Sequence, residues 1–485
     1  MAQRNTPLRS NAGVEQAGSS AAVRWTLASL SLCMLLSSLG TSIANVGLPT
    51  FTQVFNAPFQ SVQWVVLSYL LAITTLIVGV GRLGDIVGRR RLLLAGIVLF
   101  TLASVLCGLA PTLAMLIAAR AAQGLGAAIM MALTMAYVGQ TVPKAKVGSA
   151  MGLLGTMSAI GTALGPSLGG VLIDALGWRS LFLVNLPLGV LAIFLASRCL
   201  PIELRIAAKA KPRFDHLGTL VLGLALASYA LAMTLGRGHF GLLNAALLLG
   251  AALGAGIFVR VESTTAHPLI RLPMLRDPNL SAGLATNAMV STVMMATLVV
   301  GPFYLASALG LHAAMVGLVM SVGPLFAALT GVPAGRMVDR VGAPLASVAG
   351  LTAMAAASLI LSRSPTSLGI AGYVVPLAML TSGYALFQTA NNTAIMKDVV
   401  PDQRGLVSGM LNLSRNLGLI TGASAMGAVF ALAAGAADVR TALPEAVATG
   451  MRSTFGVAAA LVVVALVITL AMRRRAAHAA VIGTS

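Results

Sequence analysis

Long apolar runs alternate with short polar or charged segments along almost the whole chain. Apolar positions within a run are consecutive rather than alternating, which favours helices over the strands of a membrane barrel. A helix needs about 20 mostly apolar residues to cross the hydrocarbon core of a bilayer. The pattern predicts fourteen membrane-spanning helices, at residues 25–47, 62–81, 91–110, 113–138, 148–173, 179–198, 217–236, 241–260, 280–305, 313–334, 345–362, 367–391, 405–434 and 452–472.

A charged, glycine-containing segment occurs twice. Its first copy is Gly81–Arg91, and its second begins 254 positions later at Gly335. Five positions are identical, namely Gly81, Arg82, Asp85, Val87 and Gly88 with Gly335, Arg336, Asp339, Val341 and Gly342. The same offset pairs the ninth span with the first. The repeat therefore predicts two halves of six spans with two extra spans between them, an architecture typical of secondary transporters.

These patterns predict an all-α polytopic membrane protein of two six-helix bundles plus two extra helices. The predicted segments are a disordered tail at 1–24, an N-terminal bundle at 25–200, a linker at 201–216, an inserted hairpin at 217–262, a linker at 263–279, a C-terminal bundle at 280–472 and a tail at 473–485. Composition agrees, because the chain is 58% hydrophobic and only 9% charged. A water-soluble protein cannot hide that much apolar surface.

The basic residues are distributed unevenly between the two sides of the predicted spans. Of 31 lysines and arginines, 24 lie in the terminal segments or in loops after even-numbered spans. Five lie on the other side, at Arg179, Arg237, Arg363, Arg440 and Arg452. This bias predicts that both termini are cytoplasmic. The net charge of +19 is then a topology signal and a contact with anionic lipid headgroups. Nucleic-acid binding would need a separate basic module, and none is visible.

Three further motifs stand in order along the chain. They are Arg120-Ala-Ala-Gln123-Gly124-Leu-Gly126, Gly161-Thr-Ala-Leu-Gly165-Pro166-Ser-Leu-Gly169-Gly170, and Trp178-Arg179 with Phe182, Asn185 and Pro187. Together with Gly81–Arg91, Trp64, Tyr69 and the stretch 214–218, they make the chain resemble the fourteen-spanner drug:proton antiporter branch of the major facilitator superfamily. The resemblance runs over nearly the whole length.

The resemblance implies an exporter of drugs or amphiphilic small molecules that works by proton antiport and alternating access. Its partners would be a small-molecule substrate, protons and the lipid bilayer, with no cofactor other than the proton gradient and with a monomeric chain. The alternative is a dedicated exporter of one endogenous metabolite such as a siderophore, peptide or organic acid. Nutrient uptake is disfavoured, because the motif at Gly161–Gly170 resembles the one associated with export.

The repeated segment is the first candidate functional element. Gly81, Gly84 and Gly88 permit tight turns and close helix approach, and Asp85 can pair with an arginine or with the positive end of a helix. The resemblance implies a conformational latch on the cytoplasmic side, made of Gly81, Arg82, Gly84, Asp85, Gly88, Arg89, Arg336 and Asp339. Simple positive-inside anchoring would explain Arg89 but not the glycine–aspartate spacing or its repeat.

The fifth span carries the second candidate element, the glycine-rich motif. Gly161, Gly165, Gly169 and Gly170 let neighbouring backbones come close, and Pro166 removes one helical hydrogen bond and bends the helix. We expect this helix to act as a seal or pivot between the halves. The alternative is ordinary helix packing, which a glycine pair alone more often indicates.

Charged residues inside spans are costly and are functional candidates by default. Arg120 lies about eight residues into the fourth span, with Gln123 on the same face, and the resemblance implies a role in proton coupling or substrate charge. Arg415 is a second candidate, although its side chain can also extend towards the cytoplasm. All twelve acidic residues lie in loops, tails or span ends, and Gly40 occupies the position where related sequences carry an aspartate. We therefore predict anionic, zwitterionic or neutral cargo, with Asp85, Asp174 or the substrate itself carrying the proton.

Polar residues inside spans are candidates for a transport cavity. They are Asn45, Gln63, Trp64, Tyr69, Asn287, Gln388, Asn391 and Asn392. Asparagine and glutamine also join helices to one another, so about half of the set is expected to be structural. An enzyme is disfavoured because the five histidines are scattered. Cys33, Cys107 and Cys199 have no ligand spacing, so neither a disulfide framework nor a metal site is predicted.

Overall fold

The computed structural model describes residues 11–77, 79–141, 147–200, 215–235, 241–265, 272–397, 399, 404–435 and 442–482. The regular structure of these residues is helical. Fourteen of their helical segments are long and apolar enough to cross a membrane, the first at Val23–Val46 and the last at Pro444–Arg475. The predicted fold class and number of spans are therefore confirmed.

The N-terminal half contains six of the spans and three short helices. Its elements are α1 (Asn11–Val46), α2 (Leu48–Val54), α3 (Phe59–Ile77), α4 (Val80–Val87), α5 (Arg89–Leu109), α6 (Leu113–Thr141), α7 (Val147–Leu176), α8 (Ser180–Leu183) and α9 (Asn185–Cys199). Helix α1 packs along α7, α3 along α6, and α5 between α6 and α9. Helix α1 begins inside the stretch expected to be a disordered tail.

Two spans lie between the halves. Helices α10 (His216–Thr234) and α11 (Leu242–Thr264) pack against each other, and α10 also contacts α3. Asp215 caps α10, because its Oδ1 accepts a hydrogen bond of 2.7 Å from the Gly218 amide. At the other end, Trp64 Nε1 donates to Thr234 Oγ1 over 3.0 Å. Trp64 thus attaches the hairpin to the N-terminal half.

The C-terminal half again contains six spans. Its elements are η2 (Leu272–Arg276), α12 (Pro278–Phe303), η3 (Tyr304–Ala308), α13 (Ala313–Val341), α14 (Ala343–Arg363), η4 (Thr366–Leu368), α15 (Gly369–Lys397), α16 (Arg404–Thr421), η6 (Gly422–Met426), α17 (Gly427–Ala433) and α18 (Pro444–Ile482). Helix α14 packs between α15 and α18, and α12 packs along α16. The most extensive contact between the two halves joins α7 to α13.

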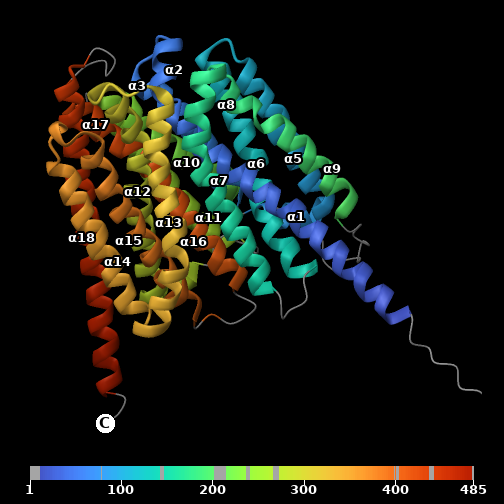
Figure 1. The fold of residues 1–485 in the computed structure, drawn as a ribbon. Coiled ribbons are helices and arrows are strands. Elements are labelled where there is room, and N and C mark those ends of the chain that lie inside the picture. Colours follow the sequence, from blue (N-terminus) through green and yellow to red (C-terminus); the bar gives the residue numbers. More distant parts are fainter. Residues whose placement is uncertain are drawn as a thin grey trace, which may run out of the picture.

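The bundle has two ends that differ in what they carry (Figure 1). We call the lower end in Figure 1 the terminal face, because α1 begins there and α18 ends there. The described ends of α6 and α15 and the starts of α7 and α16 lie on the same face. The upper end, which we call the opposite face, carries α2, α8 and α17. The two faces thus differ in the elements that can open or close a passage between the halves.

The repeated segment is more helical than the sequence suggested. Gly81 and Gly84 lie inside α4 and Gly335 lies inside α13, so none of them makes the expected turn. The turn falls on the last glycine of each copy, Gly88 with a φ of 98° and Gly342 with a φ of 84°. Such φ values are accessible to glycine at little cost. Helix α13 continues past its first charged residue, Arg336, because a long arginine side chain can extend from a helix to the aqueous edge.

Candidate transport cavity and gate

A cavity of about 490 Å³ lies between the two halves. The N-terminal half contributes methionines and small polar residues, Met34, Met131, Met135, Ser158 and Thr162. The C-terminal half contributes most of the polar lining, including Thr297, Tyr373, Thr381, Tyr384, Gln388, Asn392, Asn412 and Arg415. The lining reaches Met396, one residue before α15 ends at the terminal face. The cavity therefore extends towards the terminal face.

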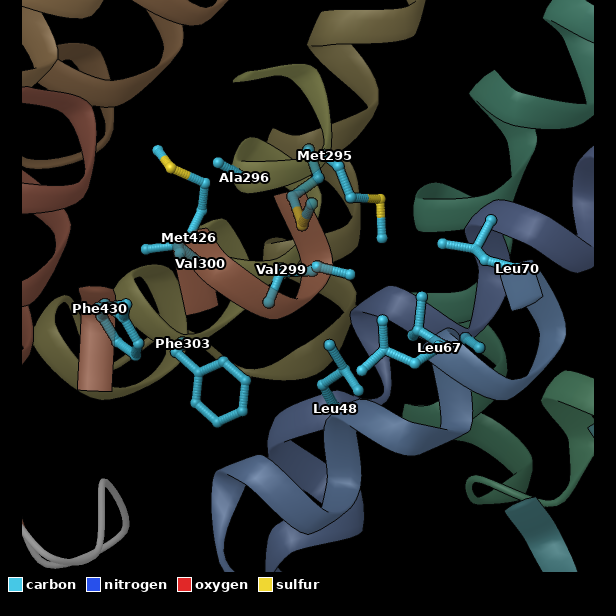
Figure 2. Close-up of a cluster of buried hydrophobic side chains, with 14 of the residues drawn as sticks. Leu48, Leu67, Leu70, Met295, Ala296, Val299, Val300, Phe303, Met426 and Phe430 are labelled. Carbon is cyan, nitrogen blue, oxygen red and sulfur yellow. The ribbon is translucent and has the colours of Figure 1, made fainter. Parts of the chain in front are cut away.

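On the opposite face the two halves are in contact. The ring of Phe59 in α3 meets the ring of Phe303 in α12 edge-on, with centroids 4.7 Å apart, and lies 5.5 Å from Phe430 in α17. Figure 2 shows side chains of α2 and α3, such as Leu48 and Leu67, gathered with those of α12, η6 and α17. These residues belong to one buried apolar cluster. This cluster closes the cavity from the opposite face.

A hydrogen bond also crosses between the halves. Gln63 Nε2 in α3 donates to the carbonyl oxygen of Ala423 over 2.9 Å. Ala423 lies in η6, a π-helical segment that interrupts the predicted span 405–434. Such segments disturb the regular backbone hydrogen-bond ladder and occur often at functional sites. Gln63 was expected to line the cavity but instead joins the halves on its closed side.

The glycine-rich motif of α7 uses two sides of the helix. A Cβ atom at Gly161 would lie 2.5 Å from the Leu35 carbonyl oxygen, and one at Gly165 would overlap Ser42. Both contacts are with α1. On another side, a Cβ at Gly170 would lie 2.5 Å from the Ala313 carbonyl oxygen and 3.0 Å from the Gly317 Cα. The motif therefore packs α7 against its own half and against α13 at once.

An acidic residue joins the same two helices at the opposite face. Asp174 lies in the last turn of α7, and its Oδ2 is 2.8 Å from His312 Nδ1. The same oxygen accepts a hydrogen bond of 2.9 Å from the Ala314 amide, in the first turn of α13. A carboxylate from one half thus caps a helix of the other, where the helix dipole favours negative charge.

Sequence comparison agrees with this architecture. The family model described as the Major Facilitator Superfamily matches residues 30–423 and 281–484. The chain belongs to the Major Facilitator Superfamily. It is 34% identical over 409 residues to the multidrug resistance protein Stp of Mycobacterium tuberculosis, covering 84% of this chain and 75% of that one. It is 31% identical over 404 residues to the riboflavin transporter RibZ of Clostridioides difficile, covering 82% and 86% of the two chains.

Solved structures share the fold at low sequence identity. A bacterial homologue of the human lysosomal transporter Spinster gives a TM-score of 0.66 at 15% identity, over 93% of this chain and 97% of that one. The xylose transporter XylE from E. coli gives 0.64 at 14% identity, over 93% and 97%. The chain is thus a multi-pass transporter of a small molecule and not an enzyme, and its fourteen spans agree with the recognised branch of the superfamily.

Arg120 is completely enclosed within the N-terminal half of this superfamily member. Its Nε donates to the Val65 carbonyl oxygen over 2.9 Å, and one terminal nitrogen donates to Gln123 Oε1 over 2.6 Å. Gln123 Nε2 continues the chain to Ser104 Oγ over 2.6 Å. The guanidinium carbon lies 4.1 Å from the ring centroid of Tyr69, a cation–π contact. Arg120 and Gln123 do not line the cavity.

No carboxylate of the described residues forms an ion pair with Arg120. Gly40 is packed against Tyr69. A Cβ at Gly40 would lie 3.0 Å from the Tyr69 hydroxyl and 3.2 Å from the Phe100 ring. The other terminal nitrogen of Arg120 is buried without a hydrogen-bond partner. The Val65 carbonyl oxygen, Gln123 and the Tyr69 ring are therefore the partners of this buried charge.

The eight predicted cavity residues fall into two groups, those that line the cavity and those that do not. Only Gln388 and Asn392 line the cavity, where Gln388 Nε2 lies 3.4 Å from Asn392 Oδ1. The other six do not line it: Asn45, Gln63, Trp64, Tyr69, Asn287 and Asn391. Most of them bond to neighbouring helices, as when Asn287 Nδ2 donates to the Leu411 carbonyl oxygen and Asn391 Nδ2 to that of Gly283. Asn45 Nδ2 instead donates to the Thr41 and Ser42 carbonyl oxygens of its own helix. The amide nitrogens thus find partners within the protein, whereas the side-chain oxygens of Asn45, Gln63 and Asn287 are buried without one.

The structure describes the burial of only some residues of the proposed latch. The side chains of Arg82 and Asp85, together with residue Gly81, lie outside the part whose burial the structure describes. Gly84 allows α4 to approach α6 closely, since a Cβ there would lie 3.0 Å from Leu133 Cδ2. Arg89 is half-buried, whereas Arg336 and Asp339 in the second copy are exposed. The latch remains a prediction.

Several lining residues were not predicted from the sequence. Met34, Met131 and Met135 face the cavity, but methionine is equally common in packed cores. Asn412 was identifiable in principle, because it lies three residues before Arg415 and so on the same face of α16. Ser158 and Thr162 give a similar pair one turn apart in α7.

Proposed function

We propose that this protein is a secondary active exporter of drugs or other amphiphilic small molecules in a bacterial inner membrane. One observation carries the proposal: a cavity lies between the two halves, extends towards one face and is closed at the other by direct contact between them. This is the arrangement expected of one state of an alternating-access cycle, in which two bundles rock around a central site.

The lining supports an amphiphilic cargo. Met34, Met131 and Met135 supply a flexible apolar wall that suits varied ligands. The names of two relatives point the same way, since Stp is called a multidrug resistance protein and JefA of Mycobacterium tuberculosis, 32% identical over 430 residues, a drug efflux pump. The name of RibZ supports a second candidate, a dedicated carrier of one metabolite.

The charge bias gives the orientation of the two faces in the membrane. The terminal face carries the predicted basic loops, so we assign it to the cytoplasm. Both termini are then cytoplasmic, and the cavity faces the cytoplasm in this state. Cargo enters from the cytoplasm or the inner leaflet and leaves when the halves separate at the opposite face. The latch at Gly81–Arg91 would hold the terminal face shut after that movement.

Proton coupling has few candidates in this chain. Among the described residues, no carboxylate lines the cavity. We assign the coupling proton to Asp174, whose charge holds α7 to α13. The elements packed against that end of α7 are α1, α8 and α13. Helix α1 carries no charged residue from Trp25 to Val46, Arg179 before α8 stacks on Trp178, and His312 precedes α13. Protonation of Asp174 from the outside would weaken the contact and favour opening there.

Transport by inside-out membrane vesicles tests the proposal. Vesicles containing the protein and depleted of ATP should accumulate riboflavin or fluorescent amphiphilic dyes when an acid-inside pH gradient is imposed. A protonophore should abolish that accumulation, and vesicles from cells lacking the protein should show none. Absence of gradient-driven accumulation across such a panel would contradict the proposed function.

A further inference from the structure

We propose that Arg415 forms an anion-binding subsite inside the transport cavity, so that the preferred cargo is an amphiphile bearing a carboxylate or a comparable anionic group. This inference rests on the proposed transport function and specifies its substrate class. It comes from one comparison within the molecule: Arg120 and Arg415 both lie well inside predicted spans, and of these two only Arg415 lines the cavity.

The two arginines differ in how their donors are used. Arg120 is fully enclosed, donates to Val65 and Gln123 and stacks on Tyr69. Arg415 is half-buried and lines the cavity. Its Nε is buried without a hydrogen-bond partner, and no ion pair with Arg415 is found among the described residues. Arg120 also has one nitrogen without a partner, but it is enclosed in its own half, whereas the unpaired donors of Arg415 lie at the cavity where a ligand can reach them.

The position of Arg415 is fixed by the neighbouring helix. Asn287 Nδ2 in α12 donates to the Leu411 carbonyl oxygen over 3.1 Å, and Ser414 Oγ donates back to the Leu284 carbonyl oxygen over 2.5 Å. These bonds hold the turn of α16 that precedes Arg415 against α12. Arg415 lies about eleven residues into α16, roughly 16 Å along the helix axis. The guanidinium is therefore carried by a helix that is bonded to its neighbour, and not by a loop.

The electrostatic surroundings favour an anion. Arg415 is the only charged residue among the cavity lining that the structure describes. The remaining lining is methionine, leucine and neutral polar residues, so no acid offsets its charge. An unpaired cation between apolar walls attracts anions strongly because little water screens it. The planar guanidinium also matches a carboxylate, which can accept two parallel hydrogen bonds.

The same cavity explains why the ligand should be amphiphilic. Asn412 and Arg415 on α16 and the Gln388–Asn392 pair on α15 put the polar groups in the C-terminal half. Apolar walls come from both halves, with Met34, Met131 and Met135 in the N-terminal half and Met294, Met320 and Met396 in the C-terminal half. An anionic head placed at Arg415 would leave an apolar or aromatic body against the methionines. Bound cargo would thus touch both halves, as a substrate that promotes their rocking must.

A pair of dyes with one ring system tests this inference. Fluorescein is anionic, and rhodamine 6G is a cation with a similar xanthene core. Binding to the purified full chain in lipid nanodiscs is followed by fluorescence anisotropy. We expect fluorescein to bind more tightly than rhodamine 6G, and Arg415→Gln to weaken fluorescein binding by about tenfold through loss of a charged hydrogen-bond donor. Arg415→Lys should recover part of the affinity, and Arg363→Gln, an exposed arginine of α14, should change nothing.

Two further readouts separate a binding role from a structural one. Rising salt should weaken fluorescein binding to the wild type more than to Arg415→Gln, because only the former binds through charge. Rhodamine 6G should bind Arg415→Gln at least as well as the wild type, which shows that the variant is folded. The inference is overturned if fluorescein binds both proteins equally, or if rhodamine 6G binds the wild type more tightly than fluorescein.

Vesicle transport then distinguishes this inference from the function on which it rests. Fluorescein binding that depends on Arg415, without gradient-driven uptake of any dye, would overturn the export function and leave the subsite in place. Gradient-driven uptake of rhodamine 6G but not fluorescein, unaltered by Arg415→Gln, would keep the exporter and overturn the subsite.

Discussion

Asp174 Oδ2 and His312 Nδ1 lie 2.8 Å apart across the joint between the two halves of the transporter. The aspartate ends α7 and the histidine precedes α13, so the pair ties together helices that must separate if the opposite face is to open. The Ala314 amide donates to the same oxygen over 2.9 Å. Because both side chains are partly exposed, the contact is weak enough to break during a transport cycle.

Asp174→Asn should favour opening of the opposite face. The amide keeps the size of the side chain but loses the charge that holds His312 and the Ala314 amide. An exposed ion pair contributes up to about 1 kcal/mol, so the open population should rise by up to about fivefold. The reporter is Ser424→Cys, a buried position in η6, labelled from outside with a membrane-impermeant maleimide.

Glu445→Gln is the matched control for that variant. Glu445 pairs with Arg452 on the same face, but both residues belong to α18 and do not bridge the halves. Its labelling rate should equal that of the wild type. Equal labelling rates for Asp174→Asn and Glu445→Gln would contradict the assignment.

Gly170→Ala should act on the same joint through sterics. The new methyl group would lie 2.5 Å from the Ala313 carbonyl oxygen, a backbone atom that cannot move without shifting α13. We expect faster labelling of Ser424→Cys from outside and a lower transport rate. Gly155→Ala lies in the same helix where a Cβ meets nothing within 4 Å, and its labelling rate should equal that of the wild type; because Gly155 lines the cavity, only labelling is compared for this variant. Equal labelling rates in the two variants would contradict the close approach of α7 and α13.

Alanine variants of the repeated glycines should differ in thermal stability, depending on whether the glycine makes a turn. Gly88 and Gly342 adopt φ values of 98° and 84°, so alanine at either position should destabilise the protein by about 1–3 kcal/mol. Gly335→Ala, inside α13 with nothing within 4 Å, should be neutral or stabilising by up to about 1 kcal/mol. Thermal unfolding of the detergent-purified protein compares them. A loss of stability for Gly335→Ala that matches Gly342→Ala would refute the assignment of the turn.

Arg120→Lys should lower thermal stability while keeping the charge. A lysine cannot donate to Val65 and Gln123 together and stack on Tyr69 with a planar group, so about 1–3 kcal/mol should be lost from partners left unsatisfied. Tyr69→Phe keeps the ring and removes only the bond from its hydroxyl to the Ser37 carbonyl oxygen, which should cost about 1 kcal/mol. Unchanged stability of Arg120→Lys would show that the network does not hold the fold.

The sequence predicted the fold well because its signals are of the kind that a membrane imposes. Each span needs a long apolar run, so the fourteen spans could be counted directly, and the repeat at Gly81 and Gly335 divided them into halves. Helix ends were less predictable. The tenth predicted span stopped at residue 334, before the first charge, whereas α13 continues to Val341 and ends at Gly342.

The site was harder to predict, because a polar residue in a span looks the same whether it faces a cavity or a neighbouring helix. Gln388 and Asn287 are both amides within spans, yet Gln388 lines the cavity and Asn287 bonds to α16. Only tertiary packing separates the two cases. Arg120 and Arg415 show the same limit, since the cost of a charge in the membrane marks both and does not say which one is already satisfied.

The most direct test of alternating access is a pair of electron–electron distance measurements on the same protein. Spin labels at Leu176 and Leu368 report the opposite face, and labels at Leu153 and Met337 the terminal face; all four residues are exposed and each pair spans both halves. Cys199→Ser removes the partly exposed native thiol. On introducing Asp174→Asn, the first distance should lengthen while the second shortens. Distances that change in the same direction, or a terminal-face distance that stays fixed, would contradict rocking of the halves around the cavity.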